Sequence, residues 1–309
     1  MDFDTTRFIH AAEEALPLSS KYIRGAITGQ VDLGQYLIKG DKTAVTVVDK
    51  MSQALARPIL LSAFSGYAIN QEETDGTEGV KDAGIAIYHD PLDGTGTFLI
   101  GAPNPTVILG AFDRVSKKVL AAATMEPVSG RFWLSVRGQG TKYRLFNYDR
   151  GKWEGSEETC AVNKQDLRGS LVTVDISHPF NRTVRGTGEK RMCLQQEERR
   201  RLTTLLENAG VKESCMNSNG ASYAILSLGR PTFAGHITTA IGGPYDVVGL
   251  LHVLEAGGDA SCYVVSQEKS GRKLGRLSTE DIETADMVIA ANKPENLDRL
   301  EEILRASLS

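Results

Sequence analysis

The chain has 309 residues, of which 41% are hydrophobic and 24% charged, and its 35 basic and 39 acidic side chains give a net charge of −4. This composition is typical of a globular protein, and the length predicts two domains or one large layered domain. The near balance of charge argues against a nucleic-acid-binding protein, which normally carries a strong basic excess.

Neither membrane insertion nor secretion is expected. No apolar run reaches the roughly 18 residues that a membrane span requires. The N-terminus, Met1 to Asp4, is acidic and lacks the basic start and apolar core of a signal peptide. The four cysteines form no CxxC pair, which indicates thiols in a reducing compartment. We therefore expect a soluble cytoplasmic protein.

Two amphipathic helices are predicted near the N-terminus. Asp4 is typical of an N-cap, and apolar residues at helical spacing continue over 8–29. Pro17 is expected to kink this helix or to end its first half. A second helix is predicted over about 46–63, where Pro58 is a candidate break.

The pattern changes at residue 84. Four short β-rich runs separated by turn residues predict an antiparallel meander over 84–140, whereas the polar segment 141–170 is expected to be irregular. A strand at 171–174 then opens a second half in which helices and strands alternate. Helices are predicted at 197–208, 221–228, 245–254 and 297–308, and strands at 262–265 and 287–290. The chain is therefore expected to divide near residue 150.

The most informative segment is Asp-Pro-Leu-Asp-Gly-Thr at residues 90–95, directly after a β-rich run. Asp90 and Asp93, with a proline between them, can point toward one site. Gly94 and Thr95 would expose backbone N–H groups at a helix start, which favours a bound phosphate. Oxygen ligands beside a phosphate indicate Mg²⁺ rather than zinc. Taken alone, an acidic turn of this kind is more often a surface loop.

Three other features support a functional site. An acidic pair, Glu72 and Glu73, follows an apolar stretch, and Asp246 opens an apolar helix far downstream. Thr46 and Asp49 place a hydroxyl and a carboxylate at the start of the second helix, where Thr46 is expected to be a helix cap.

Together these residues resemble the inositol monophosphatase superfamily of Mg²⁺-dependent, lithium-sensitive phosphatases. The family's Asp-Pro-Ile/Leu-Asp-Gly-Thr motif is present in full at 90–95. Its Trp-Asp-x-Ala motif, followed by Ala-Gly-Gly, corresponds to 245–248 and 256–258, with Tyr245 in place of tryptophan.

Three further motifs of the family occur in the expected order. Its Gly-Glu-Glu motif corresponds to 71–73, with Gln71 where glycine is usual. Its Val-Thr-x-x-Asp segment matches 45–49, and its Gly-Ser/Thr-Ala turn is approximated by 220–222. His89 stands where members usually carry an apolar residue, and a partly buried strand histidine is expected there rather than a ligand.

The resemblance implies a layered α/β (α+β) fold, the αβαβα sandwich of the sugar-phosphatase type. The subdomain 1–150 would carry the main metal and phosphate site, and the subdomain 151–309 would supply Asp246 and substrate contacts. Two or three Mg²⁺ ions are implied. Their implied ligands are Glu72, Asp90, the backbone carbonyl of Leu92, Asp93 and Asp246. A homodimer is expected because it is typical of similar proteins.

The resemblance also implies direct attack of a metal-activated water on phosphorus, without a covalent phospho-enzyme. Thr95 would orient that water, and Asp49 would accept the proton of its hydroxyl. The implied catalytic residues are Thr95, Asp49, Glu72 and Asp93. The implied substrate contacts are Gly94, Thr95, Gly220, Ala221, Thr239 and Asp246.

The substrate is expected to be a small phosphorylated metabolite, first of all one like inositol monophosphate. Thr239, seven residues before Asp246, stands where inositol monophosphatases often carry an acidic residue, so affinity for a polyol would be lower or the target different. Residues 244–246 resemble the histidinol-phosphate phosphatase branch instead, as do Phe98, Gly101 and Pro103.

Doubly phosphorylated substrates are further candidates. Fructose 1,6-bisphosphate or 3′-phosphoadenosine-5′-phosphate would need an extra basic group. Arg182, Arg185, Lys190 and Arg191 could supply one, although such residues are more often solvated. They belong to the loop 177–194, which is the expected source of substrate selection. A rival from another class is a regulatory or binding protein that retains the fold.

Overall fold

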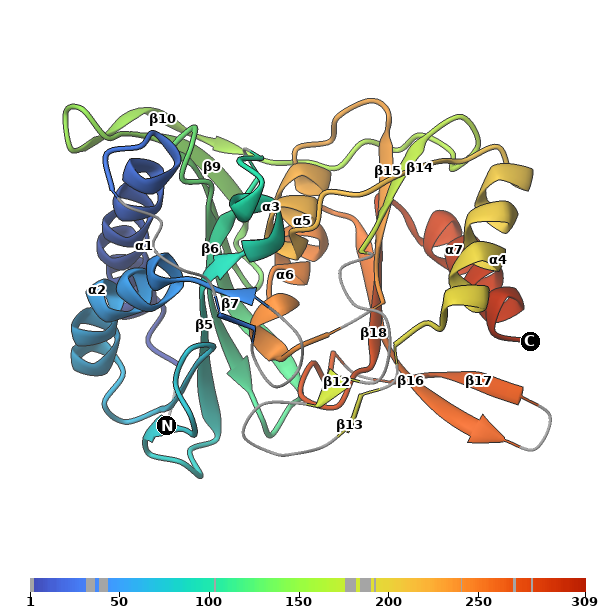
Figure 1. Cartoon of the computed structure of the whole chain (residues 1–309), viewed down its shortest axis with the longest axis horizontal. Helices are drawn as coiled ribbons and strands as arrows, with labels where there is room; N and C mark the ends of the chain where they lie inside the picture. The colour runs from blue at the N-terminus through green and yellow to red at the C-terminus, as the bar shows by residue number, and fades with distance from the viewer. Residues whose placement is uncertain are drawn as a thin grey trace.

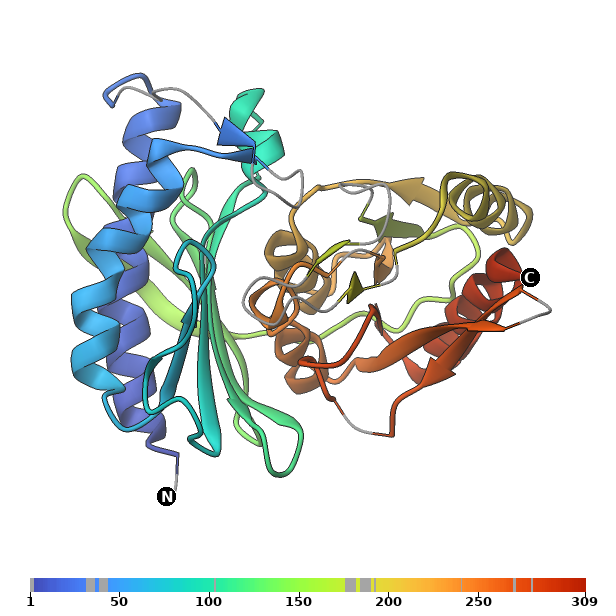
Figure 2. The same cartoon turned by 60° about the horizontal axis from the view of Figure 1, so that its bottom comes forward.

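The structure, a computed structural model, describes residues 3–31, 37–38, 44–102, 104–175, 182–183, 190–191, 193–239, 241–268, 271–278 and 280–309. Five layers succeed one another: helices, a sheet, helices, a second sheet and helices (Figures 1 and 2). The expected αβαβα sandwich is thereby confirmed. Within the described residues, no helix is both long and apolar enough to cross a membrane.

The first layer consists of α1 (Thr5–Ile27) and α2 (Val47–Ala63), which pack against each other and on the first sheet. The Arg7 N–H donates to Asp4 Oδ1 at 2.9 Å, so Asp4 is the N-cap of α1 as predicted. Pro17 and Pro58 lie inside these helices and end neither, so the helix ends expected at these prolines are absent. The alternative expectation of a kink at Pro17 stays a prediction. Burial of each helix's apolar face outweighs the hydrogen bond that a proline removes.

The first sheet has eight strands in the order β10-β9-β8-β7-β6-β5-β3-β4. They are β3 (Ala68–Gln71), β4 (Glu78–Gly79), β5 (Ile85–Asp93), β6 (Thr106–Asp113), β7 (Lys118–Met125), β8 (Arg131–Val136), β9 (Gly140–Asn147) and β10 (Lys152–Thr159). The predicted antiparallel meander is confirmed, whereas β3 pairs in parallel with β5.

The expectation of irregular structure over 141–170 was wrong, because β9 and β10 lie there. β10 is an edge strand whose residues are mostly exposed, so its sequence is polar and does not show the alternation of a half-buried strand. The first sheet thus continues to Thr159, nine residues past the predicted border at 150; the border itself stays a prediction.

The second sheet has six strands in the order β14-β11-β15-β18-β16-β17. They are β11 (Leu171–Val174), β14 (Lys212–Ser214), β15 (Phe233–Thr238), β16 (Asp259–Glu268), β17 (Gly271–Arg276) and β18 (Met287–Ala291). Its outer face is covered by α4 (Gln196–Asn208) and α7 (Pro294–Leu308). Two-residue strands form two further pairs: β1 (Leu37–Ile38) with β2 (Ala44–Val45), and β12 (Arg182–Thr183) with β13 (Lys190–Arg191).

The middle layer consists of α5 (Asn219–Ser227) and α6 (Leu250–Glu255), which contact both sheets (Figure 1). The predicted helix over 245–254 is instead a 3-10 turn, η1 (Pro244–Asp246), followed by α6. This segment approaches the first sheet closely. A Cβ at Gly110 of β6 would lie 2.5 Å from Val248, so only glycine fits there.

Candidate active site

The end of β5 carries two of the predicted metal ligands. Asp90 and Asp93 are 2% and 7% exposed, and the β5–β6 pairing is irregular between them. The Leu92 N–H donates to Asp90 Oδ1 at 2.9 Å. In a regular strand, side chains three residues apart point to opposite faces of the sheet. Because the β5–β6 pairing is irregular here, both carboxylates point toward the middle layer of helices.

The carboxylate of Asp93 is held by residues from another part of the chain. Its Oδ2 accepts hydrogen bonds from Ser218 Oγ at 2.6 Å, from the Gly220 N–H at 2.8 Å and from Thr106 Oγ1 at 3.1 Å. Ser218 is also the N-cap of α5. A Cβ at Gly220 would lie 2.4 Å from Thr106 Oγ1, so the close approach of α5 to β6 requires glycine.

Asp246 lies in η1, where its Oδ2 accepts hydrogen bonds from the backbone N–H groups of Gly242 and Gly243. It is 6% exposed. The side chain is therefore fixed by its own turn rather than by the helix that the sequence predicted to begin there. Tyr245, in place of the family's tryptophan, is buried beside it.

Glu72 follows β3, and its N–H donates to His89 O at 3.0 Å. Because β3 runs parallel to β5, this bond places Glu72 next to Asp90, and the two carboxyl groups share a hydrogen bond. The structure thus brings Glu72, Asp90, Asp93 and Asp246 into one cluster, in which the three aspartates are buried and Glu72 is partly exposed.

The electrostatics of this cluster are unfavourable to negative charge. Burial raises the pKa of Asp90 well above its ordinary value, and the neighbouring charges of Glu72, Asp93 and Asp246 raise it further. Burial also raises the pKa of Asp93 to about 7, against the lowering effect of its hydrogen-bond donors. A bound cation would favour the ionised form of both groups.

The donor set fits Mg²⁺ in chemistry, since every predicted ligand is an oxygen atom. In the described residues, however, no three His, Cys, Asp or Glu side chains are already arranged around one ion position. Asp93 and Asp246 direct Oδ2 toward protein donors instead.

Thr95 and Asp49 meet at the edge of the cluster. Thr95 Oγ1 donates to Asp49 Oδ1 at 2.8 Å, and Asp49 is fully buried. Thr46 is the N-cap of α2, as predicted, and its Oγ1 and N–H both donate to Asp49 Oδ2. Burial raises the pKa of Asp49, although the hydrogen bonds from Thr46 oppose the rise. The carboxylate expected to accept the Thr95 proton is thus fixed by α2.

Gly94 precedes the short helix α3 (Thr95–Leu99) with φ +89°. That left-handed conformation suits glycine, and a Cβ there would lie 3.0 Å from Asn217 O. The Phe98 N–H bonds Gly94 O at 3.0 Å. The predicted helix start after Gly94 is present, and its role in phosphate binding stays a prediction.

Of the other predicted substrate contacts, Gly220 and Ala221 lie beside Asp93, whereas Thr239 lies at the end of β15. The Ala221 N–H donates to the Ser218 Oγ at 3.1 Å. Thr239 is buried, and its hydroxyl donates to Asp175 O at 2.8 Å, at the ends of the neighbouring parallel strands β15 and β11. Most of the loop 177–194, including Arg185, lies outside the described residues, as does Pro103.

The buried histidines take part in structural hydrogen bonds. His89 Nδ1 lies 3.2 Å from Gln71 Oε1, and His252 lies between Thr124 and Ser135. Burial lowers the pKa of both imidazoles to about 3, so they are neutral at physiological pH. His89 is a strand histidine as expected, and it is fully rather than partly buried.

Sequence reasoning missed Thr106 and Ser218, which hold Asp93. Only the N-cap preference of serine before a helix could have indicated Ser218.

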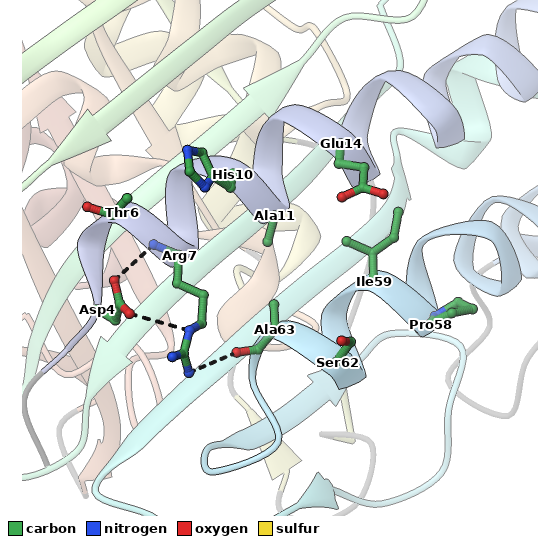
Figure 3. Close-up of a pocket in the computed structure, with 10 residues that line it drawn as sticks. All are labelled: Asp4, Thr6, Arg7, His10, Ala11, Glu14, Pro58, Ile59, Ser62 and Ala63. Atoms are coloured by element: carbon green, nitrogen blue, oxygen red, sulfur yellow. Dashed lines mark hydrogen bonds and ion pairs between the residues drawn. The ribbon is translucent and has the colours of Figure 1, made fainter.

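A separate groove of ≈ 590 Å³ lies between α1 and α2, lined among others by Arg7, His10 and Ile59 (Figure 3). None of the predicted site residues lines it.

Comparison with known protein families matches residues 5–307 to the inositol monophosphatase family. The chain is 30% identical over 149 residues to the Nus factor SuhB of Pasteurella multocida, covering 48% of this chain and 50% of that protein. It is 30% identical over 112 residues to the inositol-1-monophosphatase of Rhizobium meliloti, covering 36% and 41%. These matches span half the length or less of the curated relatives.

A likeness in structure covers almost the whole chain. The crystal structure of the extragenic suppressor protein suhB from Bartonella henselae matches with a TM-score of 0.73 at 19% identity, over 96% of this chain and 98% of that chain. At this identity the likeness shows the fold alone.

Proposed function

Because the chain belongs to the inositol monophosphatase family, we propose that it is a Mg²⁺-dependent phosphomonoesterase that hydrolyses a small phosphorylated metabolite. The observation that carries the proposal is the carboxylate cluster beside the hydrogen-bonded pair of Thr95 and Asp49. Membership of the family supports phosphatase activity. The dependence on Mg²⁺ and the identity of the substrate are our proposals.

The metal ligands in this proposal are Glu72, Asp90, the carbonyl of Leu92, Asp93 and Asp246. When bound, Mg²⁺ supplies Lewis-acid stabilisation of charge on the phosphoryl and leaving-group oxygens. Ionised Asp90 and Asp93 are required for this role, and burial disfavours that state without a cation. Ion binding and release of protons from the cluster are therefore coupled.

Thr95 is proposed to orient the attacking water. Its hydroxyl proton points to Asp49, so the oxygen presents its lone pairs to a water proton and turns the water's own lone pair outward. Asp49 holds Thr95 in this orientation because Thr46 fixes the other carboxylate oxygen. Donors from the backbone at Gly94 and Thr95 are proposed to bind the phosphate oxygens.

The proposed substrate is similar to inositol monophosphate, in keeping with the name of the Rhizobium meliloti relative. Histidinol phosphate, fructose 1,6-bisphosphate and 3′-phosphoadenosine-5′-phosphate are the competing candidates. Thr239 and Ala221 are the proposed contacts to the alcohol part of the ester. A neutral threonine cannot accept two hydroxyl donors as a carboxylate does. We therefore expect a substrate that directs fewer hydroxyl groups at this position.

The test is phosphate release from these four compounds, with Mg²⁺ and with a chelator, for the wild-type protein and for Asp93→Asn. We expect turnover of one compound that requires Mg²⁺ and is lost in the variant. Absence of turnover of all four by folded protein that binds Mg²⁺ would exclude these substrates.

A second candidate is a regulatory role, favoured by the name Nus factor that the Pasteurella multocida relative carries. If the protein has a regulatory role, deletion of its gene should give a phenotype that expression of the inactive Asp93→Asn protein rescues fully. A rescue that needs the active site would contradict it.

The proposed homodimer is tested separately by light scattering of the purified chain.

A further inference from the structure

We propose that Gln53 and Arg57 of α2 are positioning residues, which hold the loop of residues 71–78 and thereby the carboxylate of Glu72. The inference rests on the proposed function, in which Glu72 is a metal ligand. Gln53 and Arg57 follow Asp49 at intervals of four residues, so the three side chains lie along one face of the helix.

Gln53 fixes the residues that directly follow Glu72. It is 6% exposed. Its Oε1 accepts a hydrogen bond from the Glu73 N–H at 2.8 Å, and its Nε2 donates to Thr74 Oγ1 at 2.7 Å. One side-chain amide thus binds two successive residues of the loop. Replacing it with an apolar group would leave the partly buried Glu73 N–H without this acceptor.

Arg57 fixes the residue that directly precedes Glu72, through one intermediate. Its Nε and Nη2 donate to Glu78 Oε1 at 2.8 and 2.5 Å. The other oxygen of Glu78 accepts a hydrogen bond from Gln71 Nε2 at 2.7 Å. Arg57 lowers the pKa of Glu78, which keeps this acceptor ionised.

The same connection reaches the strand that carries Asp90. Gln71 Oε1 lies 3.2 Å from His89 Nδ1, and the Glu72 N–H donates to His89 O. Gln71 and His89 are both departures from the family's motif pattern, and here they contact each other. The polar pair replaces a glycine and an apolar residue, and it ties the loop to β5 by side chains as well as by backbone.

Glu72 is therefore flanked on both sides by residues that α2 holds, while α2 also holds Thr95 through Asp49. One rigid helix sets the relative position of two parts of the proposed site. Side chains supported in this way lose less freedom when a ligand binds, so we expect tighter ion binding than an unsupported loop would give.

The test compares Gln53→Met and Arg57→Met with Arg131→Met as the matched control. Arg131 likewise donates from Nε and Nη2 to a glutamate, Glu126, and none of the hydrogen bonds described for this pair involves the loop of residues 71–78. Binding of Mn²⁺ as a probe is measured by calorimetry, and melting temperatures are recorded without metal. We expect Gln53→Met to raise the Mn²⁺ dissociation constant about 10-fold and Arg57→Met several-fold, with no change for Arg131→Met.

Two further readouts separate this inference from the proposed function. Glu72→Gln tests the metal ligand itself: equal Mn²⁺ binding by this variant and the wild type overturns the metal assignment. Hydrogen exchange of the Glu72 and Thr74 amides tests the support, since neither amide bonds to Gln53. We expect faster exchange in Gln53→Met, together with slower turnover at low Mg²⁺ that saturating Mg²⁺ restores. If the exchange rates of these amides in Gln53→Met equal those of the wild type, the positioning role is overturned, whether or not the Mn²⁺ affinity changes.

Discussion

Replacing Asp93 by asparagine separates the chemical role of this carboxylate from its structural one. All the hydrogen bonds described for Asp93 use Oδ2, and an asparagine oxygen can accept them from Ser218, Gly220 and Thr106 in the same geometry. The amide removes the charge and places an NH₂ donor where the second carboxylate oxygen was, so this residue no longer offers an anionic oxygen to a metal ion. We therefore expect a folded protein whose phosphatase activity falls by about 100-fold or more, since even groups that only support metal ligands cost about 10–100-fold.

The same substitution has a calculable effect on stability in the absence of metal. The pKa of Asp93 is raised from 3.8 to about 7 in the folded protein. Between these values the folded state holds a proton that the unfolded chain has released, so stability falls as the pH rises toward 7. At about 1.4 kcal/mol per pH unit, and with the folded group half ionised at pH 7, this group removes about 2 kcal/mol between pH 5 and pH 7.

The assay is urea unfolding with a chelator present, at pH 5 and pH 7, for both proteins. Because asparagine exchanges no proton, Asp93→Asn lacks this part of the pH dependence, and we expect its free energy of unfolding to fall by about 2 kcal/mol less than that of the wild type. Equal pH dependence of the two proteins would refute the electrostatic argument. Retained turnover by the folded variant would refute the metal assignment.

Substitutions at three more positions test other parts of the site. Thr95→Ala should lower kcat by about 100-fold without changing Mn²⁺ affinity, and Thr95→Ser, which keeps the hydroxyl for Asp49, should restore most of it; equal rates for both variants would contradict the role of the hydroxyl. Thr239→Glu should shift kcat/KM toward phosphates of polyols or amines, and an unchanged ranking of substrates would show that this position does not face them. Gly220→Ala should lower the free energy of unfolding by about 1–3 kcal/mol, because its Cβ would meet Thr106; unchanged urea stability would contradict that crowding.

The sequence predicted those parts of the site that are contiguous in the chain. Asp90 to Thr95 form a single strand-to-helix turn, so their grouping follows from local geometry alone. Ser218 and Thr106 meet Asp93 only through the packing of α5 on β6. No spacing rule relates such residues, and serine and threonine are too common to stand out.

The errors in secondary structure have similar causes. Pro17 sits in a helix whose buried face stabilises it through contacts with other elements, which a local propensity does not contain. The exposed edge strand β10 has no apolar face to produce a pattern. The apolar residues on both sides of Asp246 predicted one continuous helix over 245–254. Asp246 instead lies in a 3-10 turn that begins at Pro244, and the helix α6 begins only at Leu250.

The middle layer has a consequence for biosynthesis. Ile108, Phe112 and Trp133 of the first sheet are buried in the same cluster as Tyr223 of α5 and Leu251 of α6. These helices leave the ribosome long after the sheet: Asp93 and its donor Gly220 are 127 positions apart. At about 5–20 residues per second, the interval is about 6–25 s. Because the sheet itself ends at Thr159, the nascent sheet lacks the helices that cover its apolar face during the later part of this interval, and we expect chaperones to bind that face before the chain completes its site.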